Sequence, residues 1–152
     1  MRDIFKLAIS IVLPFLASAI GGIFTASSVS TWYVELAKPS FNPPSWVFGP
    51  VWTVLYLIIG ISFYLVWKRK YDKIAFTIFG VQLVLNALWS VLFFGLKMPF
   101  LAFIEIVFLW LSIMLMIFYF YRISRISAYL LIPYVLWVTF AAILNFYIYI
   151  LN

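Results

Sequence analysis

The sequence contains no cysteine and no histidine among its 152 residues. Disulfide bonds, thiol nucleophiles, imidazole bases and the common zinc or haem ligand sets are therefore excluded. Charge is also scarce, because 9% of the residues are charged and only four of them are acidic. No pairing of a nucleophile with a base is visible, so the residues give no support to hydrolysis or metal-dependent catalysis.

Apolar side chains are in large excess. Hydrophobic residues make up 68% of the chain, aromatic residues make up 22%, and the mean hydropathy is +1.19. A typical soluble domain is nearer half apolar and a quarter charged. A folded globule of this size cannot hide so much apolar surface from water, so the composition predicts an integral membrane protein. The net charge of +6 comes from residues at helix ends, which indicates membrane topology and no nucleic-acid partner.

Hydropathy divides the chain into five apolar runs, each long enough to cross a bilayer core of roughly 30 Å. The runs cover about residues 4–24, 46–67, 74–96, 100–121 and 127–151. A transmembrane β-barrel needs alternating segments of about ten residues instead. The sequence therefore predicts an all-α integral membrane protein, a five-transmembrane-helix bundle forming a single domain over residues 1–152. The proline-containing loop 25–45 is long enough to act as a lid over a pocket.

Lysine and arginine are distributed unequally between the two ends of this bundle. One end has Lys38 and Lys97, and the end with the N-terminus has Arg2, Lys6, Lys68, Arg69, Lys70, Lys73, Arg122 and Arg125. The positive-inside rule then places the N-terminus in the cytoplasm and the C-terminus outside, in a prokaryotic cell membrane.

Polar side chains inside the expected spans fall on shared helical faces, although such groups are costly in hydrocarbon. The faces consist of Gln82, Asn86, Trp89, Ser90 and Phe93; of Trp137, Phe140, Ala141, Leu144 and Asn145; and of Trp52, Tyr56 and Gly60. One interpretation is interhelical hydrogen bonding, at about 1 kcal/mol for each bond. The other is a cavity for a large, flat, mostly apolar ligand, with aromatic walls and a few polar groups that fix its orientation. The residues alone favour neither.

Two further features remain open at this level. Glu105 lies about 9 Å along its helix from Pro99, so we expect it near an interface, reaching headgroups or Lys97, with a proton-relay role as the alternative. The small-residue pairs Ala17/Gly21 and Ser18/Gly22 allow close helix approach, either within the bundle or in a homodimer.

Three segments carry a family resemblance that extends over essentially the whole chain. They are Trp32 to Trp52 with its Lys38-Pro39 and Asn42-Pro43-Pro44 sequences; Gln82 to Phe94; and Leu131 to Asn145 with its Pro133-Tyr134 pair. In this order they resemble the TspO/MBR family, the tryptophan-rich sensory proteins related to the mitochondrial translocator protein. The C-terminal cholesterol pattern of eukaryotic members needs a basic residue that is missing after Tyr147, so cholesterol is not the natural ligand expected from the resemblance, and a prokaryotic source is favoured.

The resemblance implies a five-helix protein, commonly dimeric, that needs no cofactor and binds protoporphyrin IX and benzodiazepine-type or isoquinoline ligands. The resemblance also implies that Trp52 and Asn86 make polar contacts with the ligand. Ser90 joins them from the helical face, and the residues implied to line or close the pocket are Tyr33, Pro43, Trp46, Phe48, Phe93, Trp137 and Ala141. Trp137 also matches a tryptophan linked to light-dependent porphyrin breakdown.

The function expected from these features is a membrane sensor or receptor that regulates tetrapyrrole handling. The alternative is a transporter or carrier of porphyrin or lipid. A transporter coupled to ions needs charged groups within the membrane, and the spans contain a single carboxylate, which weakens this alternative.

Overall fold

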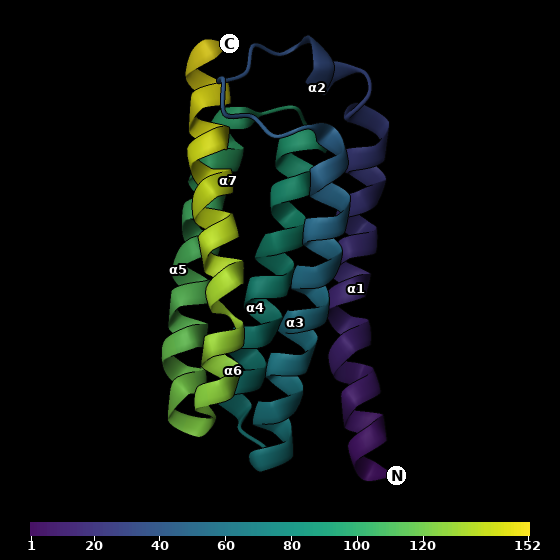
Figure 1. The fold of residues 1–152 in the computed structure, drawn as a ribbon, viewed down its shortest axis with the longest axis vertical. Coiled ribbons are helices and arrows are strands. Elements are labelled where there is room, and N and C mark those ends of the chain that lie inside the picture. Colours follow the sequence, from purple (N-terminus) through teal and green to yellow (C-terminus); the bar gives the residue numbers. More distant parts are fainter.

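Five helices run along the molecule and are long and apolar enough to cross a membrane, as expected from the sequence. A computed structural model describes residues 1–152 (Figure 1). Its elements are α1 (Arg2–Ser28), α2 (Trp32–Glu35), the 3-10 turn η1 (Ser45–Val47), α3 (Phe48–Arg69), α4 (Lys73–Ser90), the π-helical turn η2 (Val91–Gly95), α5 (Pro99–Ile123), α6 (Arg125–Leu130) and α7 (Ile132–Leu151). The all-α, five-span architecture predicted from hydropathy is confirmed.

The first helix is longer than its apolar run, because α1 continues through polar residues as far as Ser28. The Thr25 hydroxyl donates to the carbonyl of Gly21 at 3.0 Å, and the Ser28 hydroxyl donates to the carbonyl of Phe94 at 2.7 Å. Hydroxyl groups that bond to backbone carbonyls in this way are tolerated inside a helix. The connection to α3 is therefore residues 29–47, called the lid segment below, and it contains α2 and η1.

The fifth apolar run is two helices, with Leu131 between α6 and α7. Pro133 lies in the first turn of α7, where its missing N–H leaves no backbone bond unmade. At the start of α6, the Ser124 hydroxyl accepts a long bond of 3.4 Å from the backbone N–H of Ser127. Hydropathy predicts one continuous span here, but the span divides into α6 and α7 next to Pro133.

The spans form a ring that is closed at one end and open at the other. Helix α1 packs against α3 and α4, α4 against α5, and α5 against both α6 and α7. On its side away from α1, helix α3 packs against the short α6 and makes little contact with α7. The ring therefore closes near the N-terminus and separates between α3 and α7 towards the lid segment, which crosses that end of the bundle (Figure 1).

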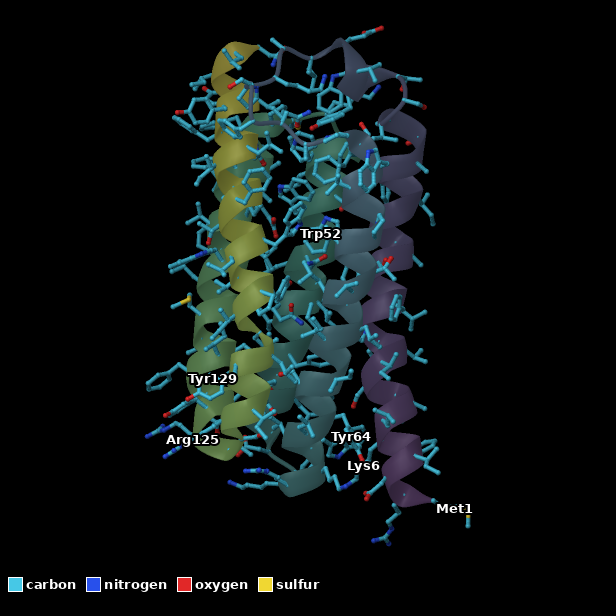
Figure 2. All side chains as sticks on the ribbon, in the orientation of Figure 1. Met1, Lys6, Trp52, Tyr64, Arg125 and Tyr129 are labelled. Atoms are coloured by element: carbon cyan, nitrogen blue, oxygen red, sulfur yellow. The ribbon has the colours of Figure 1, made fainter.

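Most of the apolar core fills the closed half, where Ile59, Val66 and Ile113 are fully buried. The rings of Phe63 and Phe79 stack there at 3.8 Å between centroids. Figure 2 shows Lys6, Tyr64 and Arg125 at this end of the molecule and Trp52 nearer the lid segment. The closed half thus carries the basic residues Lys6 and Arg125, and Trp52 lies towards the open half.

Candidate ligand-binding cavity

A cavity of about 330 Å³ occupies the open half, beneath the lid segment. It is lined by 22 residues, which come from α1, α2, η1, α3, α4, η2 and α7 and, between α1 and α2, from Val29. Ligand sites for small molecules usually measure about 300–1,000 Å³, so this one is at the small end of that range. The separation of α3 from α7 creates the space, and the lid segment closes it.

Eight of the ten residues expected to contact a ligand line this cavity. They are Tyr33, Phe48, Trp52, Asn86, Ser90, Phe93, Trp137 and Ala141. Pro43 and Trp46 do not line it, and the Trp46 side chain is 74% exposed on the outside of η1. The three helical faces found in the sequence therefore meet around one space, while ligand contact itself remains a prediction.

One wall was not anticipated, because α1 contributes Ser18, Gly21, Gly22 and Thr25. The sequence indicated small residues for close packing only. At Gly21 that packing is real, since an added Cβ would lie 2.9 Å from the Ser90 hydroxyl oxygen. The same small side chains leave room for the cavity, and their spacing along one face of α1 was the available signal.

Aromatic rings supply the rest of the wall. Trp52 stacks on Tyr56 at 5.4 Å between centroids, and Trp89 stacks on Phe93 at 5.1 Å. The ring edge of Trp137 meets Phe48 at 6.1 Å. Such rings offer flat apolar area for dispersion and stacking.

A line of hydrogen bonds, called the polar chain below, leads from this wall into the protein. The Tyr56 hydroxyl donates to Asn86 Oδ1, and Asn86 Nδ2 donates to the Tyr134 hydroxyl at 2.8 Å. The Tyr134 hydroxyl then donates to Gln82 Oε1 at 2.8 Å. The polar chain joins α3, α4 and α7, so Asn86 is both an interhelical contact and a wall residue.

Some of the hydrogen-bonding groups at the cavity wall are already engaged within the protein. Both ends of the Asn86 amide are engaged in the polar chain. The indole N–H of Trp89 is also used, because it donates to Asn145 Oδ1 at 3.0 Å. Trp137 Nε1 is buried and has no partner, although its ring lines the cavity. This indole is therefore an unpaired donor in the cavity wall, and nothing in the residue spacing distinguishes it from the other tryptophans.

The lid segment is fixed above the cavity by side-chain contacts. The Tyr33 hydroxyl donates to Asn42 Oδ1 at 2.8 Å, and burial raises the pKa of Tyr33 to about 12, so this donor keeps its proton. Phe41 meets the edge of Tyr147 on α7 at 5.3 Å. The side-chain amide of Asn152 pairs with both the N–H and the carbonyl of Ala37, at 3.0 and 2.9 Å. These contacts tie the segment to the C-terminal end of α7, and its role as a lid stays a prediction.

Glu105 does not occupy the position expected for it. It is 6% exposed, and neither carboxylate oxygen has a hydrogen-bond partner. It shares the buried face of α5 with Ala102, Ile106 and Leu109, so it points into the bundle and forms no ion pair with Lys97. The expectation of a headgroup or lysine contact is wrong, because the direction around the helix matters as much as the distance along it.

Comparison with known proteins agrees with this arrangement. The model of the TspO/MBR family matches residues 10–151. The chain belongs to the TspO/MBR family. It is 45% identical over 152 residues to the tryptophan-rich protein TspO of Archaeoglobus fulgidus, with 99% of each chain covered. It is also 33% identical over 138 residues to the human translocator protein, covering 88% of this chain and 82% of that one.

A third relative is named tryptophan-rich sensory protein, from Cereibacter sphaeroides, and is 33% identical over 140 residues, covering 90% of this chain and 88% of that one. The family resemblance of the sequence is confirmed. The relatives support a membrane sensor or receptor role for the chain, and its five apolar helices fit a multi-pass integral membrane protein.

Proposed function

We propose that this TspO/MBR protein is a sensor that binds protoporphyrin IX, and benzodiazepine-type or isoquinoline ligands, in the cavity under the lid segment. The observation that carries the proposal is the meeting of eight separately predicted residues around one aromatic space. The unpaired indole N–H of Trp137 adds a donor for a carbonyl or carboxylate oxygen. No resident cofactor is needed, because stacking and hydrogen bonding supply the recognition.

Cavity size distinguishes the two ligand types. A bicyclic or tricyclic drug-sized molecule fits the volume of about 330 Å³. A porphyrin macrocycle is larger, so we expect it to displace part of the lid segment and to leave its propionates near the opening between α3 and α7. Porphyrin association should therefore be slower than that of the smaller ligands.

In this role the bundle reports on tetrapyrrole supply from within the bilayer, with a second copy as the expected partner. A carrier of porphyrin or lipid is the alternative. It is distinguished by flux of protoporphyrin IX across sealed proteoliposomes, which a sensor does not require.

The test measures quenching of tryptophan fluorescence by protoporphyrin IX in detergent. Trp52→Phe combined with Asn86→Ala should weaken saturable quenching at least tenfold. Trp110→Phe is the matched tryptophan control, because its indole donates to Thr139 at 2.8 Å on the outer face between α5 and α7.

Asn86→Ala also breaks the polar chain, so a second pair of variants tests the cavity by filling it. Ala141 lines the cavity, whereas its neighbour Ala142 lines the outer groove. Ala141→Phe should abolish binding and Ala142→Phe should preserve it. Equal affinity of these two variants would place the ligand outside the cavity.

A further inference from the structure

Arginine side chains gather at the turn between α5 and α6. Figure 2 shows Arg125 there, at the end of the molecule opposite the lid segment. Arg122 lies in the last turn of α5, Arg125 begins α6, and Ser124 is the single residue between the two helices. Arg69, at the end of α3, reaches the same turn, because its Nη1 donates to the Ile123 carbonyl at 3.2 Å. Three guanidinium groups therefore come from three helices to one turn.

Two of these guanidinium groups lie over aromatic rings on the outside of the bundle. Arg122 is 5.5 Å from the ring centre of Phe118, and Arg125 is 5.5 Å from that of Tyr121. Both rings are exposed, and Tyr121 meets the edge of Tyr129 on α6 at 6.1 Å. Because α5 is a membrane span, exposed rings near its end mark the level where hydrocarbon gives way to lipid headgroups. The two guanidinium groups are therefore at headgroup depth, beside the bundle.

No carboxylate of the chain neutralises the three arginines. The acidic residues at this end are already engaged, since Asp3 pairs with Lys68 at 3.7 Å and Asp72 pairs with Lys70 at 3.1 Å. The other two acidic residues are elsewhere, in α2 and on the buried face of α5. A guanidinium group carries five N–H donors, and of the three only Arg69 uses one within the protein. The turn thus presents positive charge and many free donors.

We propose that this turn, called the arginine site below, binds the phosphate of an anionic phospholipid. Arg122 and Arg125 are its principal ligands, and Arg69 supplies further donors. The planar guanidinium fork matches phosphate oxygens two at a time, and stacking on a ring holds that fork in place before the lipid arrives. The acyl chains then lie along the exposed apolar side of α5, next to Phe118. The site is at the other end of the bundle from the cavity, so it does not depend on the proposed function.

The position of the arginines favours a lipid over a soluble partner. Membrane topology accounts for the number of basic residues at this end, because lysine and arginine stay on the cytoplasmic side. It does not account for guanidinium groups that lie over rings on the outside of α5. A soluble acidic segment approaches from the water beyond the turn and gains nothing from those rings. A zwitterionic headgroup brings its own cation, which the three arginines repel, so a lipid with net negative charge should bind more tightly.

The experiment measures the binding of single lipid molecules by native mass spectrometry of the protein released from detergent micelles. Dioleoylphosphatidylglycerol is the anionic probe, and dioleoylphosphatidylcholine is the zwitterionic one. The two lipids have the same acyl chains and one phosphate each, so headgroup charge is the variable. A basic group near the membrane surface strengthens association with anionic lipid about fivefold, so the first phosphatidylglycerol should bind at least that much more tightly than phosphatidylcholine.

Two double variants with the same change in net charge test the arginine site. Arg122→Gln combined with Arg125→Gln should lower the affinity for phosphatidylglycerol about fivefold or more and leave that for phosphatidylcholine unchanged. Arg2→Gln combined with Lys68→Gln is the matched control, because it removes two positive charges at the same end of the bundle. Lys68 is directed towards Asp3 on α1, and α1 and α5 lie on opposite sides of the bundle (Figure 1). This control should keep the preference of wild type.

Three results would overturn the proposal. Equal affinity of wild type for the two lipids does so without any variant, which covers the case in which a double variant does not fold. An equal loss of preference in the two double variants shows that the net charge of this end, and no particular site, attracts the lipid. Displacement of phosphatidylglycerol by inorganic phosphate or by a soluble oligoglutamate, at matched ionic strength, shows that the arginines recognise a free anion or an acidic peptide and need no lipid.

Discussion

Replacement of Tyr134 by phenylalanine should destabilise the bundle more than its small size suggests. The change removes one hydroxyl and keeps the ring, which is completely buried. That hydroxyl accepts from Asn86 Nδ2 and donates to Gln82 Oε1, both at 2.8 Å. Tyr134→Phe therefore leaves a donor and an acceptor without partners in the interior of a membrane protein.

The magnitude follows from these two lost bonds. Interhelical hydrogen bonds in membranes contribute about 0.6 kcal/mol on average and at most about 1.7 kcal/mol. A buried polar group left unsatisfied costs about 1–3 kcal/mol. We therefore expect the free energy of unfolding to fall by about 1–3 kcal/mol, since some rearrangement of the two amides offsets the loss.

The assay is unfolding by SDS titration in mixed micelles, followed by helical circular dichroism. Tyr129→Phe is the matched control, because Tyr129 lies on the adjoining α6 with its side chain 56% exposed (Figure 2). Surface substitutions of this kind usually change stability by less than about 0.5 kcal/mol. If the two variants unfold at the same SDS fraction, the polar chain does not stabilise the bundle and the reasoning is refuted.

Three further predictions concern other parts of the chain. Trp137→Phe removes one hydrogen-bond donor, so it should still bind protoporphyrin IX saturably with affinity lowered by about two- to tenfold, and it should lose light-driven porphyrin breakdown, measured by bleaching of the Soret band; unchanged bleaching would remove this tryptophan from the chemistry. Asn152→Ala removes both hydrogen bonds between the Asn152 side chain and the backbone of Ala37. Because the lid segment is then held less firmly, ligand dissociation should be faster in a stopped-flow experiment. An unchanged rate would show that the lid segment opens elsewhere. Asp72 accepts from the backbone N–H groups of Ala75 and Ile74, and the bond from Ala75 is the largest cause that lowers the pKa of Asp72. The cap therefore stabilises α4 above the ordinary pKa of aspartate and is lost as pH falls through the lowered value, so the stability of Asp72→Asn should be less sensitive to acid than that of wild type.

The spans and their inward faces were predictable because the bilayer restricts the possibilities. Backbone groups in hydrocarbon must bond internally, so long apolar runs become helices. Within a helix the 100° spacing of residues then groups Gln82, Asn86 and Ser90 on one face without knowledge of neighbours. The structure brings that face together with those of α3 and α7, as the sequence indicated.

The predictions that failed concern residues outside regular helices or contacts between helices, where the helical periodicity of the sequence gives no information. Pro43 and Trp46 lie in the lid segment, whose path depends on tertiary contacts such as Phe41 with Tyr147. The extension of α1 to Ser28 depends on a hydroxyl bond to Phe94, 66 residues away. Hydrogen-bond partners across helices cannot be derived from spacing within one helix.

Glu105 shows the difference between depth and direction most clearly. Its depth, about 9 Å along the helix from Pro99, followed from the rise per residue. Helix α5 is apolar on nearly every side, so periodicity gave no direction around the axis. The cost of a carboxyl group facing lipid supplied the missing information, because such residues nearly always face the bundle interior. The same cost explains why Glu105 is buried between helices and away from lipid, even though neither of its oxygens has a hydrogen-bond partner there.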